Sequence, residues 1–129
     1  MHVTLLNALA IAVGATLGAW GRWMLGLAMN HLIPHFPLGT LVANLFGGLL
    51  MGIVLAFIQL GHLEIPHWRL MITTGFLGGL TTFSAFTGES LVLLQKQHYS
   101  LALLHTSSHV FGALIFAALG FMLVNYLRS

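Results

Sequence analysis

The sequence predicts an all-α integral membrane protein with four transmembrane helices. Its 129 residues are 58% hydrophobic and only 5% charged, and the mean hydropathy is +0.97. A soluble domain averages about 25% charged residues, so this chain belongs to a different class. Four apolar segments are each long enough to cross the hydrocarbon core, which takes about 20 helical residues. Because short connectors join them, we expect residues 1–129 to form a single four-helix membrane domain.

Turn-forming and polar residues separate the four segments. The first connector holds Pro34 and Pro37, and the second holds Glu64 and Pro66. A short polar link that starts at Gln95 makes the third. Proline ends or kinks a helix, so these positions mark its boundaries. The predicted spans are residues 3–29, 38–60, 70–95 and 99–126.

Composition excludes several classes of function. The chain has no cysteine, which rules out disulfides, cysteine metal sites and a cysteine nucleophile. Its basic residues are few and scattered, so we expect no nucleic acid partner, which would need a clustered basic face. No nucleophile–base set or phosphate-binding loop is visible, and we predict that the chain is not an enzyme. The four basic residues are Arg22, Arg69, Lys96 and Arg128.

The third span contains the most unusual stretch of the chain, Thr73–Glu89. It has glycines at 75, 78 and 79, followed by a run of hydroxyl residues, all at bilayer depth. We therefore predict a break in mid-membrane, after a first half of about 16 Å from Leu70 to Leu80 and before a second half beginning near Gly88. Such a break frees backbone carbonyls that can coordinate Na⁺. It can equally be a kink healed by Thr and Ser side chains.

The distribution of Lys and Arg gives no preferred orientation in the membrane. Arg69 and Arg128 fall on one side of the predicted topology, and Arg22 and Lys96 on the other. Orientation normally follows such a bias. A chain without bias can insert both ways, and we infer an antiparallel homodimer. The alternative is a single orientation fixed by partners or by features outside this rule.

Small residues recur at helical contact spacing on the first two spans. This spacing lets membrane helices approach closely. The positions are Ala10, Gly14 and Gly18 on the first span, and Gly48 and Gly52 on the second. Asn44 continues the second of these faces by one turn, where its amide can join helices or present donors to a passing ion.

Phe83 and Phe86 share a helix face in the third span. Packing is the ordinary role of such a pair, but a ring edge carries the positive end of the aromatic quadrupole. Edges flanked by donors such as Asn44 and Ser84 would suit a small anion. Conduction requires binding weak enough for the ion to leave.

Arg22 and Glu89 are the charged residues placed inside spans, where an ionisable group suggests function. Arg22 can snorkel to the interface or attract anions at a vestibule. Glu89 can titrate in a proton-coupled cycle or brace the broken helix. His105 and His109 lie one turn apart, a spacing that can chelate a metal, but without a visible third ligand we favour packing or hydrogen bonding.

Three segments together resemble the Fluc (CrcB) family of fluoride channels. They are GATLGAWGRW at 14–23, PLGTLVANLFGG at 37–48 and TTGFLGGLTTFSAF at 73–86. The resemblance covers essentially the whole chain. It implies a bacterial plasma-membrane protein, an antiparallel dual-topology homodimer with two pathways, and passive release of fluoride from the cytoplasm.

The resemblance also implies roles for particular residues. Phe83 and Phe86 would offer ring edges to fluoride, and Asn44 would line the pore. Backbone carbonyls of Gly78 and Thr81 from both subunits would hold a structural Na⁺ at the dimer centre. The family arginine of the first helix corresponds to Arg22.

The chain departs from the family pattern at four positions. Ala85 and Thr87 differ from the common TFSTFS sequence, and Ala113 and Ala117 replace hydroxyl residues on the fourth span. The sequence therefore does not support a row of hydroxyl groups from the fourth span along the pore.

Two other functions share these sequence features. One is a proton-coupled exporter of hydrophobic cations that uses Glu89, and the other is a non-transporting subunit of a larger assembly.

Overall fold

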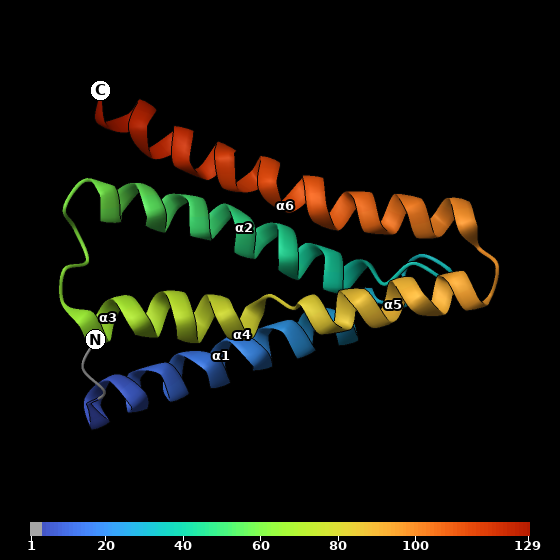
Figure 1. Cartoon of the computed structure of the whole chain (residues 1–129), viewed down its shortest axis with the longest axis horizontal. Coiled ribbons are helices and arrows are strands. Elements are labelled where there is room, and N and C mark those ends of the chain that lie inside the picture. The colour runs from blue at the N-terminus through green and yellow to red at the C-terminus, as the bar shows by residue number, and fades with distance from the viewer. Residues whose placement is uncertain (1–3) are drawn as a thin grey trace.

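The computed structural model describes residues 4–129 and consists of long helices joined by short connections (Figure 1). Three membrane crossings are single helices: α1 (Leu5–Met29), α2 (Leu38–Gln59) and α6 (Tyr99–Arg128). The third crossing has four parts: α3 (Pro66–Leu70), the π-helical η1 (Met71–Leu77), α4 (Gly78–Leu80) and α5 (Phe83–Gln95). Val3, the predicted start of the first span, lies outside the described residues.

The structure confirms four helices that are long and apolar enough to span a membrane, and a broken third helix. Their most apolar stretches have mean hydropathies between 1.2 and 2.4. The third crossing begins at Pro66 rather than at Leu70 as predicted. Proline is accepted in the first turn of a helix because the N–H it lacks would have no helical partner there.

The break is shorter than the sequence predicted. The second half begins at Phe83 and not near Gly88, so only Thr81 and Thr82 are outside the helices. The prediction failed because hydroxyl residues favour helix starts as well as loops. The side chain of Thr82 accepts a hydrogen bond from Ala85 N at 3.0 Å, which caps the new helix.

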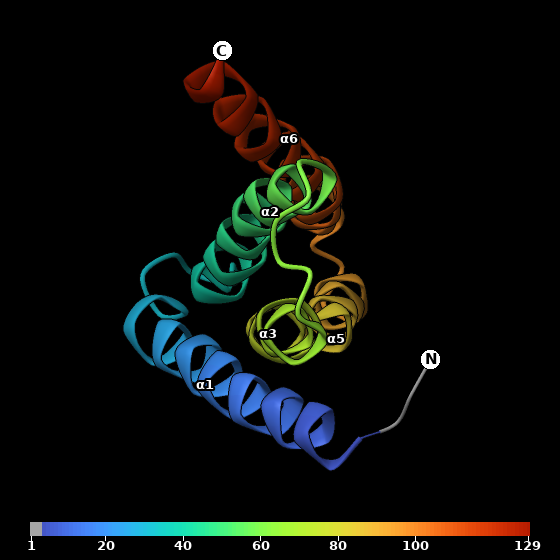
Figure 2. The ribbon, with the colours of Figure 1, turned by 90° about the vertical axis from the view of Figure 1, so that its left-hand side faces the viewer.

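The broken helix lies between α1 and α2, and α6 lies on the far side of α2 (Figures 1 and 2). α1 packs against η1 and α4, whereas α2 packs chiefly against α6. The described start of α1, the start of α3 and the end of α6 lie at one end of the bundle (Figure 1). This end carries Arg69 and Arg128, and the opposite end carries Lys96.

Glycines allow close contacts between helices, as the small-residue spacing predicted, and two of them show how. A Cβ added at Gly18 would overlap the carbonyl oxygen of Phe76 in η1. A Cβ added at Gly52 would overlap that of Ala117 in α6. Backbones therefore meet directly at both contacts, and small residues are required there.

Burial is concentrated in the middle of the bundle. Ala43, Leu77 and Leu80 form a buried cluster between α2 and the first half of the third crossing. In the apolar windows of the crossings, 39% of α2 residues are buried but only 11% of those in α1 and in α6. The outer helices therefore leave large apolar faces for lipid or for another protein chain.

Candidate ion pathway

Asn44 of α2 organises the break in the third crossing. Its Nδ2 donates to the carbonyl oxygen of Thr82 at 3.0 Å, and its Oδ1 accepts from Thr82 N at 2.8 Å. A single side chain therefore satisfies both polar backbone groups of a residue outside the helices. In a bilayer, unpaired backbone groups cost several kcal/mol each, so this pairing allows the break to exist.

The same bonds leave two carbonyl groups without their usual helical donors. In a continuous α-helix, Gly78 O would accept from Thr82 N, and Thr81 O from Ala85 N. Here Thr82 N donates to Asn44, and Ala85 N donates to the Thr82 side chain. Gly78 and Thr81 are the residues assigned to Na⁺ by resemblance, and backbone carbonyls are the hard oxygen ligands such a cation takes.

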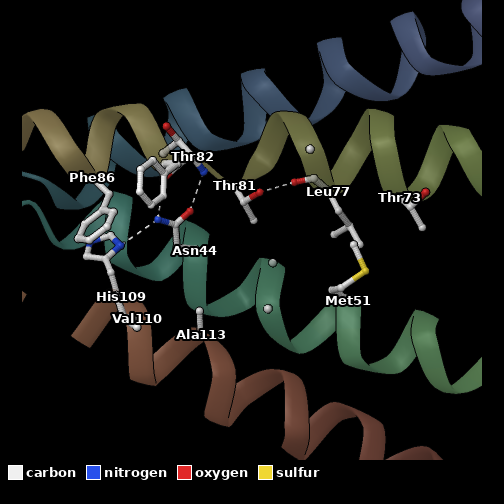
Figure 3. Close-up of a pocket in the computed structure, with 14 residues that line it drawn as sticks. Asn44, Met51, Thr73, Leu77, Thr81, Thr82, Phe86, His109, Val110 and Ala113 are labelled. Carbon is white, nitrogen blue, oxygen red and sulfur yellow. Dashed lines mark hydrogen bonds between the residues drawn. The ribbon is translucent and has the colours of Figure 1, made fainter. Parts of the chain in front are cut away.

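A groove of about 470 Å³ runs along the break between α2, the third crossing and α6 (Figure 3). We call it the central groove. It brings together five of the residues predicted from sequence: Asn44, Gly78, Thr81, Phe83 and Phe86. Ser84 is not among the lining residues; it is exposed, and its hydroxyl lies 3.4 Å from that of Thr82.

The two phenylalanines differ in their surroundings. Phe83 is 78% exposed in the single chain, whereas Phe86 is 8% exposed. Their rings meet edge to face, with centroids 5.6 Å apart and planes at 78°. Phe86 also stacks on His109, with a centroid separation of 4.6 Å. The pair thus joins a buried aromatic stack to the open side of the central groove.

Arg22 of α1 makes a hydrogen bond to the broken helix. Its Nε donates to the carbonyl oxygen of Gly79 at 3.3 Å. Gly79 lies in the last turn before the break, where carbonyls lose their helical partners. The contact places this guanidinium beside the break, and not at the end of the bundle.

Glu89 of α5 is held by donors on two other helices. The hydroxyl of Thr40 donates to Oε2 at 2.7 Å, and His105 Nε2 lies 3.0 Å from Oε1. Both carboxylate oxygens are therefore partnered across helix boundaries. Such contacts fit the bracing role that the sequence left open for this residue.

The two histidines of α6 have polar partners that the sequence alone did not identify. His105 is fully buried, with Nδ1 2.8 Å from the hydroxyl of Ser90 and Nε2 at Glu89. His109 has Nδ1 2.9 Å from Asn44 Nδ2 and lines the central groove. Their four-residue spacing signalled a shared face, but only the folded chain shows which polar partners meet them.

Ala113 and Ala117 have a packing role on the same helix. Their backbone carbonyls lie where a side chain on Gly48 or Gly52 would be, so α2 and α6 meet without intervening side chains. Ala113 also lines the central groove and offers it no hydrogen-bonding side chain. Any donor that α6 offers to the groove therefore lies at another position on the helix.

Known proteins provide a direct comparison. The family described as "CrcB-like protein, Camphor Resistance (CrcB)" matches residues 9–121. The chain is similar to the fluoride-specific ion channel FluC of Cupriavidus pinatubonensis, with 50% identity over 115 residues, 89% of this chain and 91% of the relative. It is 48% identical over 114 residues to the FluC protein of Pseudomonas syringae pv. maculicola, covering 88% and 90% of the two chains.

A third relative gives the same result. The fluoride-specific ion channel FluC of Aromatoleum aromaticum is 50% identical over 113 residues, 88% of this chain and 86% of the relative. These relatives are named as channels, in agreement with the prediction that the chain is not an enzyme. Four spans and this family make it a multi-pass protein of the bacterial membrane. The chain belongs to the CrcB family.

Proposed function

We propose that this protein is a fluoride channel that lets fluoride leave the cytoplasm passively. The observation that carries the proposal is the central groove, where Asn44, Phe83 and Phe86 converge on a helix break. Close relatives are named fluoride-specific channels. The groove has no Lys or Arg among its lining residues within the described part of the chain, so a passing anion meets only weak donors.

Weak donors are appropriate for a small, strongly hydrated anion. Ring edges of Phe83 and Phe86 present partial positive charge, and the break adds polar groups at the same depth. Together they replace part of the hydration shell without holding the ion tightly, as conduction requires. Ser84 lies between Phe83 and Phe86 in the sequence, and its exposed hydroxyl can serve the same path.

The pathway is completed by a second, inverted copy of the chain. The central groove is open on one side, and Phe83 is largely exposed at its rim. Lys and Arg are few, with Arg69 and Arg128 at one end of the bundle and Lys96 at the other, so the bias toward one orientation is weak and insertion both ways is open to the chain. An antiparallel homodimer would close two grooves, one on each subunit, and form two pathways.

A structural Na⁺ fits the carbonyl groups of Gly78 and Thr81. Their usual helical donors are bonded to Asn44 and to the Thr82 side chain. Two inverted copies would contribute four such carbonyls at the dimer centre. The cation would neutralise converging carbonyl dipoles and stabilise the dimer.

Purified protein in liposomes tests the function directly. We expect fluoride efflux that needs valinomycin and K⁺ for electrical compensation but no pH gradient. Drug-driven proton flux that is lost in Glu89→Gln would instead identify a proton-coupled exporter. Absence of both activities would identify a non-transporting subunit.

Orientation and sodium dependence need separate measurements. The chain has no cysteine, so a single cysteine at Gln97 gives one labelling site. We expect half of the molecules to react with an impermeant maleimide from each side of the membrane. Reaction from one side only would contradict the inverted dimer. Fluoride flux and dimer stability that do not change when N-methylglucamine replaces Na⁺ would contradict the sodium site.

A further inference from the structure

We propose that the Nε2–H group of His109 is the hydrogen-bond donor that α6 gives to the transported anion. The proposal rests on the proposed fluoride channel function and specifies one ligand of its path. It assigns this role to an imidazole on the helix where Ala113 and Ala117 provide no hydroxyl group.

His109 has an unsatisfied polar atom in a closely packed environment. Its side chain is 4% exposed, and Nε2 is the buried side-chain nitrogen or oxygen atom without a hydrogen-bond partner among residues 4–129. Buried polar groups are nearly always paired, and an exception calls for a functional explanation. A missing ligand is one such explanation.

The surrounding hydrogen bonds determine which nitrogen carries the proton. Asn44 is oriented by Thr82, because its Oδ1 accepts from Thr82 N and its Nδ2 donates to Thr82 O. The group that faces His109 Nδ1 at 2.9 Å is therefore the NH₂ donor. A neutral histidine whose Nδ1 accepts must carry its proton on Nε2. The unsatisfied atom is thus a donor.

A donor at this position argues against a metal ligand. One potential ligand atom each from Glu89, His105 and His109 lie within 4.8 Å of one another, which is a metal-like grouping. A metal at His109 Nε2 would need a lone pair there and a proton on Nδ1. Asn44 would then have to turn round and lose both bonds to Thr82. An anion or a water molecule fits the observed bonds instead.

His109 lies beside the proposed path, and Nε2 itself is buried rather than exposed to the groove. The residue lines the central groove, and its ring stacks on Phe86 at 25° between planes (Figure 3). Glu89 accepts from Thr40 and pairs with His105, and no hydrogen bond joins it to His109 Nε2 in the described part of the chain. Its negative charge nearby would shorten the stay of an anion, which favours passage over tight binding.

Flux measurements on matched variants test the donor. His109→Phe keeps a ring against Phe86 and removes the N–H, and we expect fluoride flux to fall at least tenfold. His109→Gln restores an amide donor and should retain more flux than His109→Phe. His62→Gln, on an exposed residue, should conduct like the parent protein. Equal flux in His109→Phe and the parent protein would overturn the proposal.

Nuclear magnetic resonance gives a readout that does not depend on a variant folding well. In ¹⁵N-histidine-labelled protein, the His109 resonance is the one absent from His109→Gln. We expect fluoride, but not chloride, to shift its Nε2–H signal. No shift in a protein that conducts would mean that the donor binds water only. Block of flux by Ni²⁺ that disappears in His109→Gln would make Nε2 a metal ligand; either result overturns the proposal.

Failure of the channel function and failure of the His109 assignment give different experimental results. If the parent protein shows no fluoride flux in liposomes, the channel function itself is wrong. If it conducts but His109 is insensitive to fluoride, only the assignment of this donor is wrong.

Discussion

Asn44 and Thr82 are 38 residues apart in the chain, yet their amide groups form two reciprocal hydrogen bonds of 3.0 and 2.8 Å. Asn44, which the sequence suggested as a pore residue, therefore also pairs with the backbone N–H and C=O groups of Thr82 in the break. Asn44 further contacts His109, so one side chain links α2, the third crossing and α6. Support of the helix break and contact with the proposed ion path depend on the same amide.

Replacing Asn44 should therefore affect stability and flux together. Asn44→Ala removes the partners of Thr82 N and O, and we expect the free energy of unfolding to fall by about 1–3 kcal/mol. Fluoride flux should fall at least tenfold. Asn125→Ala in α6 is the control, because the Asn125 side chain supports no helix break within residues 4–129. Unfolding in detergent and liposome efflux measure the two effects. A stable Asn44→Ala protein with unchanged flux would contradict both roles.

Isoleucine at Phe83 and at Phe86 should lower flux in both cases but change stability to different extents. Phe83→Ile removes a ring that is 78% exposed in the single chain, so we expect flux to fall with little change in unfolding of the subunit. Phe86→Ile removes a buried, stacked ring and should also lower stability by about 1–2 kcal/mol. Phe57→Ile, near the end of α2, should leave flux unchanged. Unaltered flux in Phe83→Ile and Phe86→Ile would exclude the ring-edge mechanism.

Substitution by alanine should have opposite effects on stability at two glycines, Gly52 and Gly88. Gly52→Ala places a methyl group on the backbone of Ala117, so α2 and α6 must separate and stability should fall by about 1–3 kcal/mol. A Cβ at Gly88 would meet nothing within 4 Å in the subunit, and alanine is the better helix former. Gly88→Ala should therefore be neutral or stabilising in thermal unfolding of the monomer. Similar losses in both variants would show that the close contact of α2 with α6 is not the cause.

The hydroxyl of Thr40 should stabilise the protein through its hydrogen bond to Glu89. Thr40→Val keeps the shape of the side chain but removes the donor to Glu89 Oε2, a charge-assisted bond of 2.7 Å. We expect the free energy of unfolding to fall by about 1.5–3 kcal/mol. Thr74→Val, on an exposed residue of η1, is the matched control and should change it little. An unchanged stability in Thr40→Val would show that Glu89 does not depend on this contact.

Composition and spacing by themselves determined the membrane class, the four spans and the small-residue faces. These features follow from hydrophobic length and helical periodicity, which are properties of single segments. The sequence also located the break in the third crossing, because glycines and hydroxyl residues gather there. It misplaced the start of α5, since Thr82 is a helix cap in this setting and not part of a longer loop.

Only the tertiary structure decided how the polar side chains are paired. Glu89 meets Thr40 and His105, Arg22 meets the carbonyl of Gly79, and His109 meets Asn44. These partners lie on different helices, and hydrophobic periodicity does not specify which polar groups face one another across a contact. The direct backbone contacts at Gly18 and Gly52 bring the helices close enough for such bonds to form. The protonated nitrogen of His109, and with it the proposed donor, follows from that pairing alone.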